Sequence, residues 1–172
     1  QWLRQNHLID NGFPTGFKLP DDVFRASDTA APNLESLRIS PVSVDSKTNE
    51  FVITVTARIT DDASGNAGKG YNSSPSQIGF SSPSGGTSVT AMLSDRHRIS
   101  GDSKDGVVVY EMRLNNLFEK GEWRIRSVLL ADQLGNIQWL RQSHLIDKGF
   151  PTGFKLVTPD PDSPALKPDN RR

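Results

Sequence analysis

Seven side chains with oxygen atoms suited to metal binding lie in segments that are rich in turn-forming residues. They are Asp28, Asp61, Asp62, Asp102, Asp105, Asp132 and Asn136. Calcium takes six to eight hard oxygen ligands at about 2.3 to 2.6 Å, from carboxylates, carbonyls and water. Asp and Asn also favour turns, because they hydrogen-bond to their own backbone. A Ca²⁺ site and a set of ordinary turns are both open interpretations, and the elements that position these residues decide whether they meet.

Catalytic chemistry has little support in the sequence. Of three histidines, His7 and His144 occupy the same place in two copies of one segment, and the chain has no cysteine. None of the GxSxG, HExxH or Walker patterns occurs. Asp61 and Asp62 are neighbours at a strand end and point apart, which does not suit a glycosidase pair. We therefore expect a protein that is not an enzyme.

The composition also narrows the partners. Twenty basic and twenty acidic residues cancel, and the mean hydropathy is -0.50. A neutral chain offers no basic field for nucleic acid. No apolar run approaches the 18 residues of a membrane span. We expect a soluble domain that binds no nucleic acid and does not insert into membranes.

Between the candidate ligands, the pattern of apolar residues alternates with the period of β-strands. From Phe51 to Ile59, every second residue is apolar while Thr and Arg occupy most of the other positions. Similar runs, separated by Gly, Asn, Asp and Ser, predict about seven strands: 35–44, 51–60, 76–82, 88–94, 107–114, 122–131 and 137–141. Seven short alternating strands in about 110 residues predict an all-β antiparallel sandwich.

One segment of nineteen residues occurs twice. Residues 1–19 and 138–156 are identical except that Asn6 is replaced by Ser143 and Asn11 by Lys148. The offset of 137 residues has the size of a domain. We therefore expect 1–27 to be the tail of a preceding repeat and a linker, 28–157 a β-sandwich repeat, and 158–172 a linker to the next repeat. Residues 1–19 could take the place of 138–156 on another molecule, so we expect a mainly monomeric protein with domain-swap potential.

The second copy of this segment is interpreted as the closing element of the domain. Ser143 is expected to cap a short helical turn over 144–147, Gly149 to end it, and 150–156 to return extended. Its large apolar residues are expected to cover an edge or an open end of the sandwich. The alternative is a carbohydrate-stacking surface built on Trp2 or Trp139, or on Tyr71, and solvent exposure of Trp139 separates the two.

Several strings together resemble the bacterial Ig-like repeats of large secreted and cell-surface proteins, including adhesins and multidomain exoenzymes. These strings are TDDASG, SPSG, SGDSKDG, GEWRI, LLADQLGN and HLIDKGFPTGF, within about residues 28–157. The resemblance implies an Ig-like sandwich at an extracellular or cell-surface location that spaces, adheres or binds, often with calcium. In an Ig-like topology, the start of the first strand and three of the loops share one end. The seven candidate ligands would then converge.

Two functions follow as expectations. The first is a non-catalytic repeat that acts as a spacer or adhesion unit, stiffened by Ca²⁺, with neighbouring repeats of its chain as partners. The alternative is a carbohydrate-binding module appended to a secreted enzyme, with a glycan or a protein surface as ligand. Tandem repetition suits extension, although multivalency would also strengthen weak sugar binding.

Overall fold

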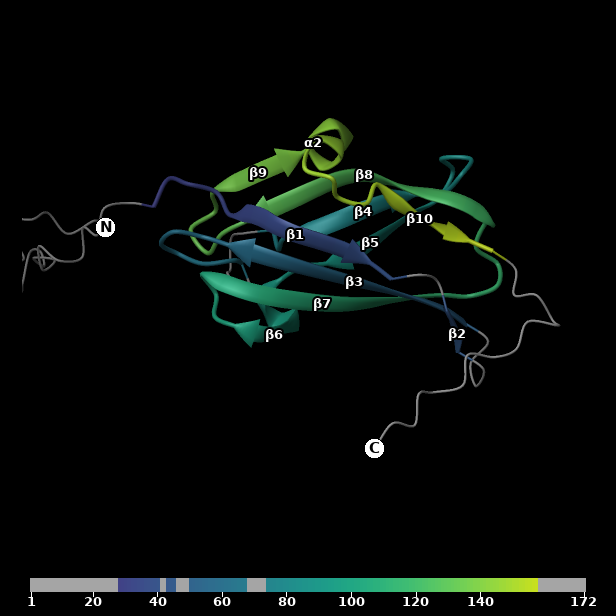
Figure 1. Ribbon diagram of the computed structural model, residues 1–172, viewed down its shortest axis with the longest axis horizontal. Coiled ribbons are helices and arrows are strands. Elements are labelled where there is room, and N and C mark those ends of the chain that lie inside the picture. The colour runs from purple at the N-terminus through teal and green to yellow at the C-terminus, as the bar shows by residue number, and fades with distance from the viewer. Residues whose placement is uncertain (1–27, 41–42, 46–49, 68–73, 158–172) are drawn as a thin grey trace, which may run out of the picture.

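Two antiparallel β-sheets pack face to face in the computed structural model, which describes residues 28–40, 43–45, 50–67 and 74–157 (Figure 1). The predicted flanking segments 1–27 and 158–172 lie outside the described residues, as do Trp2 and Tyr71. Within the described residues, no helix has the length and apolar character needed to cross a bilayer.

The first sheet contains five strands among the described residues, in the order β1-β3-β7-β6, with β2 also paired to β3. Its central strand β3 confirms the predicted alternation, because every second side chain from Phe51 to Ile59 is buried in the core. The strands are β1 (Asn33–Ile39), β2 (Ser43–Asp45), β3 (Glu50–Thr60), β6 (Arg98–Gly101) and β7 (Asp105–Leu114).

The second sheet, again of five strands in the described part of the chain, has the order β10-β8-β4-β5, with β9 also paired to β8. Trp123 and Ile125 of β8 point into the core and are 0% and 3% exposed, as predicted. The side chains of Arg124, which lies between these two residues, and of Arg126, which follows them, are exposed. The strands are β4 (Gln77–Ser81), β5 (Ser88–Met92), β8 (Gly121–Ala131), β9 (Ile137–Leu140) and β10 (Gly153–Leu156).

The strand order is that of an Ig-like sandwich. Strands β1, β3, β7 and β6 occupy the positions A, B, E and D of one sheet, while β4 and β8 occupy C and F of the other. Position G is divided between β9 and β10, and β5 adds a strand beside β4. The predicted fold class is therefore confirmed.

The identity of the fourth strand differs from the prediction. Segment 88–94 forms β5 (Ser88–Met92) and stays beside β4, because a tight connection joins them, with the Ser82 N–H donating to the Thr87 carbonyl at 2.9 Å. Position D belongs instead to β6, whose four residues are all exposed and so carry no alternation. The predicted strand 35–44 is likewise two strands, because β1 ends at Ile39 and β2 begins at Ser43.

The closing element covers the edge of the second sheet, as predicted. Strands β9 and β10 both pair with β8, and helix α2 (Gln142–Asp147) lies between them in the chain. Leu145 and Leu156 are fully buried, and Phe154 stacks on Trp123 with ring centroids 5.9 Å apart. Two details differ from the prediction. The residue that caps α2 is Arg141 rather than Ser143, and the Trp139 side chain is 56% exposed.

Candidate functional site

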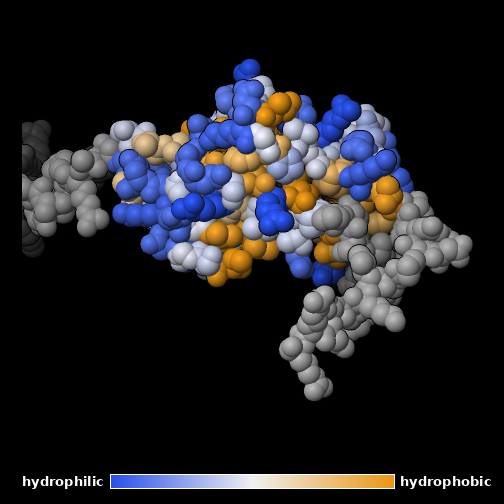
Figure 2. Space-filling model, viewed as in Figure 1, coloured by the Kyte–Doolittle hydropathy of each residue, from blue (hydrophilic) through white to orange (hydrophobic). Residues whose placement is uncertain are grey.

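Three of the loops with candidate ligands are joined at one end of the sandwich. The Asn136 side-chain amide donates to the Asp28 backbone carbonyl at 2.9 Å, which ties the β8–β9 turn to the start of β1. Backbone pairing between Asn66 and Asp132 ties the same turn to the β3–β4 loop. Figure 2 shows that most residues at the end of the molecule at which β1 begins are hydrophilic, with a few apolar residues among them.

A cluster of three carboxylates, Asp28, Asp61 and Asp62, lies at this end. One oxygen from each residue lies within 4.8 Å of the others. Asp28 and Asp61 are half-buried and Asp62 is exposed. Among the described residues, no Lys, Arg or His forms an ion pair with any of the three. Negative charge therefore accumulates here without a described cationic partner, which favours the binding of a cation.

Backbone N–H groups orient two of these carboxylates. The Ser64 N–H donates to Asp28 Oδ2 at 2.8 Å, and the Gly65 N–H donates to Asp61 Oδ1 at 2.6 Å. Asp61 Oδ2 is buried and has no hydrogen-bond partner of acceptable geometry, and the same is true of the Ser64 hydroxyl oxygen. A buried carboxylate oxygen without a donor loses its hydration with no compensation. It is the atom of the cluster that most needs a partner.

The surroundings of Asp28 favour its ionised form. The pKa of Asp28 is lowered from its ordinary value, chiefly by the adjacent Ser64 side chain, while desolvation opposes the shift and the Ser64 and Ala30 N–H groups support it. A carboxylate oxygen has two lone pairs, so one that accepts from an N–H group can still bind a metal ion. Asp28 therefore presents an ionised carboxylate, and the cluster as a whole presents partly oriented oxygen atoms of the kind that calcium binds.

Asp132 and Asn136 serve the β8–β9 turn. Asp132 is fully buried, and its Oδ1 accepts from the backbone N–H groups of Leu134 and Asn136 at 2.9 and 2.7 Å. Its Oδ2 accepts from the Asn136 side-chain amide at 2.6 Å. Both oxygens are occupied by donors within one turn, so this pair positions the loops beside the cluster.

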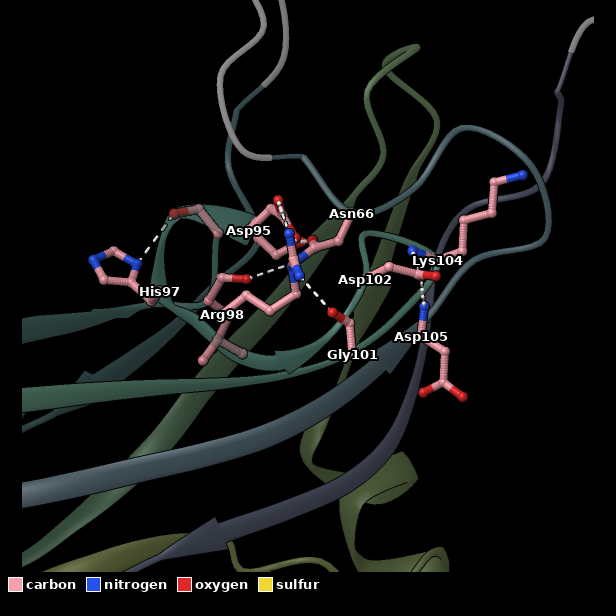
Figure 3. A network of polar contacts seen from close by, with 11 residues as sticks. Asn66, Asp95, His97, Arg98, Gly101, Asp102, Lys104 and Asp105 are labelled. Atoms are coloured by element: carbon pink, nitrogen blue, oxygen red, sulfur yellow. Dashed lines mark hydrogen bonds and ion pairs between the residues drawn. The ribbon is translucent and has the colours of Figure 1, made fainter.

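Asp102 lies in the β6–β7 turn and Asp105 is the first residue of β7, and their carboxylates have other partners (Figure 3). Asp102 Oδ1 accepts from the N–H groups of Lys104 and Asp105 at 2.8 and 3.0 Å. The Asp105 carboxylate points away from Asp102, as Figure 3 shows. It forms a two-pronged ion pair with Arg58 at 2.8 and 2.7 Å. The structure brings Asp28, Asp61 and Asp62 together and places this second acidic pair in separate contacts.

A buried polar network behind the cluster was not predicted from the sequence. The Ser76 hydroxyl donates to Asn66 Oδ1 at 2.6 Å and accepts from the Ala131 N–H at 3.0 Å. The Asn66 amide donates to the Leu93 carbonyl at 2.9 Å. This network fixes the β3–β4 loop, to which Asn66 and Ser76 belong, against the last residue of β8 and the residue that follows β5. In the sequence, Asn66 is one of several small polar residues in a Gly-rich stretch, and no periodicity distinguishes it.

Comparison of the chain with protein-family models, with curated proteins and with solved structures found no match.

Proposed function

We propose that the domain is a non-catalytic extracellular or cell-surface module of the bacterial Ig-like type, which acts as a spacer or adhesion unit and is stiffened by Ca²⁺ bound at Asp28, Asp61 and Asp62. The observation that carries the proposal is the cluster itself. Segments 33 residues apart in the chain bring three carboxylates within 4.8 Å, and one of them holds a buried oxygen without a donor. A calcium ion would offset most of the negative charge of the three carboxylates and would bind the buried Asp61 Oδ2.

The position of the cluster supports a role between domains. Asp28 immediately precedes the segment that leads into β1, so an ion bound there would join the incoming chain to the β3–β4 loop. The carboxylates of Asp28, Asp61 and Asp62 repel one another in the absence of the ion, and this repulsion opposes the contacts that hold the two segments together. Calcium binding would therefore hold the segment that leads into β1 in a fixed position relative to the domain. A fixed junction between domains makes a spacer stiffer.

The positions of the strand ends support an extended array of neighbouring repeats. Asn136, just beyond the end of β8, contacts Asp28, whereas Leu156 pairs with Gly121 at the start of β8. The eleven residues of β8 span roughly 35 Å. The start of β1 and the end of β10 thus lie at opposite ends of the long axis (Figure 1). Domains joined in this way extend end to end.

One observation favours the alternative function, a carbohydrate-binding module. The Trp139 side chain is 56% exposed, so it is available for stacking on a sugar ring. This alternative does not compete with the calcium site for residues, because Trp139 belongs to β9 and to neither segment of the cluster.

Thermal unfolding of the full chain in 5 mM CaCl₂ and in EDTA tests the proposed function. Extracellular calcium modules bind with dissociation constants of about 0.1 to 1 mM. A ligand at about ten times its dissociation constant stabilises the folded state by roughly 1.4 kcal/mol. For a domain of this size, the melting temperature should rise by about 3 to 6 °C. Identical unfolding curves in the two solutions would overturn the calcium site.

Three variants make this test specific. Asp61→Asn keeps the Oδ1 acceptor for Gly65 but replaces the unpaired oxygen with an amide, and it should abolish the calcium-induced shift. Asp62→Asn should reduce the shift. Glu122→Gln removes the same charge from an exposed position on β8, far along the strand from the cluster, and should keep the full shift. A shift that survives Asp61→Asn would place the ion elsewhere.

A further inference from the structure

A groove of about 230 Å³ crosses the outer face of the second sheet, over strands β5, β4, β8 and β9. It lies on the sheet face opposite the core. Ligand pockets for drug-sized molecules usually measure about 300 to 1,000 Å³. This groove is smaller and suits a single ring. The residues that give it chemical character are Gln77, Gly79, Thr90, Arg126, Ser127 and Trp139.

Strand register brings these residues together. Leu129 of β8 pairs with Gln77 on one side and with Trp139 on the other. Gly79, two residues beyond Gln77 in β4, pairs with Ser127 and with Thr90. A β-bulge interrupts the pairing of β4 with β8, because Gly79 and Phe80 pair with Ser127 and Ile125 and leave Arg126 without a partner residue on β4. A bulge redirects side chains. Here Arg126 and Ser127, adjacent in sequence, both line the groove.

Gly79 lines the groove at a position where no side chain fills it. A Cβ atom at this position would meet only the Ser127 side chain at 3.3 Å and the Ser127 carbonyl oxygen at 3.9 Å among atoms within 4 Å. Its φ lies outside the left-handed region, so the backbone does not require glycine. The missing side chain leaves room for a ligand, and a larger residue would fill that room without backbone strain.

Several polar side chains that line the groove have no hydrogen-bond partner among the described residues. In the described part of the chain, the side chains of Gln77, Thr90 and Arg126 make no hydrogen bond or ion pair, and the Trp139 indole has no ring partner. One exposed indole beside free hydrogen-bonding groups can pack against the C–H face of a pyranose while those groups bind its hydroxyls. Arg126 is the only charged residue among the described groove residues, and it is positive.

We propose that this groove binds one pyranose unit that carries a carboxylate, such as a uronic acid within a polysaccharide. The sugar ring stacks on Trp139, Gln77 and Thr90 bind its hydroxyls, and the Arg126 guanidinium pairs with the carboxylate. Charge-assisted, two-pronged bonds between Arg and a carboxylate are stronger than neutral ones and are geometrically specific. A single subsite binds weakly, and several repeats in one chain would raise the avidity.

Titration of the ¹⁵N-labelled full chain with tetragalacturonate, followed by NMR, tests this site. The Trp139 indole N–H signal should shift saturably, and neutral cellotetraose should bind at least tenfold more weakly. Trp139→Ala should lower the affinity for tetragalacturonate at least tenfold, because a Trp anchor dominates a small interface. Gly79→Val should abolish binding by filling the groove. Arg126→Gln should lower the affinity for tetragalacturonate to that for cellotetraose.

Arg124→Gln is the matched control. Arg124 is an exposed arginine on the same strand, outside the groove, and its loss should leave the affinity unchanged. Equal losses from Arg124→Gln and Arg126→Gln would mean non-specific attraction and would overturn the site. Absence of a saturable shift, or binding that survives Trp139→Ala or Gly79→Val, would do the same. The titration is made in EDTA as well as in calcium. A failure to bind the sugar would therefore contradict this groove alone, and the calcium-dependent rise in melting temperature would remain a separate test of the proposed function.

Discussion

The Asn136 side-chain amide donates to the Asp28 backbone carbonyl at 2.9 Å, across 108 residues of sequence. The same amide donates to Asp132 Oδ2 at 2.6 Å. One side chain therefore binds a fully buried carboxylate and holds the segment that leads into β1. The geometry of the carboxylate cluster depends on this contact, because Asp28 is positioned by it.

Asn136→Ala should lower the free energy of unfolding by about 2 to 3 kcal/mol, because it leaves a buried charged acceptor short of a donor. Asn115→Ala is the control, since the Asn115 side-chain oxygen accepts one hydrogen bond, from the Leu117 N–H at 3.0 Å, in an exposed turn. It should cost less than about 1 kcal/mol. Urea denaturation measures both values. Equal losses in the two variants would show that Asn136 is only a turn residue.

Trp123→Ala should lower the free energy of unfolding by about 3 to 5 kcal/mol, as large core truncations do. Its indole is fully buried, stacks on Phe154 and donates to the Glu119 carbonyl at 2.9 Å. Trp139→Ala removes the same side chain from a half-exposed position and should cost less than about 1 kcal/mol. If the loss for Trp123→Ala were below about 1 kcal/mol, the inward register of β8 would be wrong.

Gly101→Ala should destabilise the β6–β7 hairpin more than Gly85→Ala destabilises the β4–β5 connection. Both glycines have left-handed φ values, 76° and 77°. Each substitution by alanine therefore carries the same conformational penalty, about 1 to 2 kcal/mol. A Cβ at Gly101 would overlap the Asp105 carbonyl oxygen, whereas no heavy atom of the described residues lies within 4 Å of one at Gly85. Chemical denaturation should show an additional loss of at least about 1 kcal/mol for Gly101→Ala. Equal losses would refute the close approach.

Stability should fall as the pH is lowered below about 5. The pKa of Asp105 is lowered chiefly by its hydrogen bonds with Arg58, that of Asp102 by the Asp105 and Lys104 N–H groups, and that of Glu119 by Ser84. A carboxyl group with a lowered folded-state pKa contributes stability above its unfolded pKa of about 4. That contribution is lost as the pH falls through the folded value, because the unfolded chain binds more protons.

Asp105→Asn isolates one part of this pH dependence. It removes the charge that pairs with Arg58, so the fall in unfolding free energy between pH 5 and pH 3 should be smaller than in the native chain. Glu122→Gln, at an exposed carboxylate without a hydrogen bond among the described residues, should keep the native slope. Urea denaturation at each pH gives both slopes, and identical slopes in all three proteins would contradict the assignment.

The parts of the fold that follow from local pattern were predictable. Alternation from Phe51 to Ile59 and around Trp123 reports which face of a strand is buried, because that face must be apolar. Strand β6 escaped prediction because Arg98–Gly101 is exposed on both faces and exists through its pairing with β7. Trp139 is large and was expected to be covered, yet it lies on the outer face of its strand, which a residue's hydrophobicity alone does not reveal.

The candidate site was predictable in its location and less so in its composition. An Ig-like topology brings Asp28, Asp61 and Asp132 to one end, and they do meet there. Which carboxylates keep free oxygens depends on backbone N–H groups such as those of Gly65 and Leu134, whose direction is set by turn geometry. The pairing of Asp105 with Arg58 likewise depends on the register between β3 and β7, where Thr60 faces Asp105.

The opposite placement of the strand ends has a mechanical consequence. Tension between neighbouring domains would pull β1 from its first residue, Asn33, and β10 from its last, Leu156, each along its own axis. Antiparallel hydrogen bonds run perpendicular to the strands, so such a pull shears a whole ladder at once instead of unzipping it bond by bond. Resistance to force is governed by the rate of unfolding. In a domain that carries tension as the proposed spacer would, the β1–β3 and β8–β10 ladders would therefore set the force at which the domain unfolds.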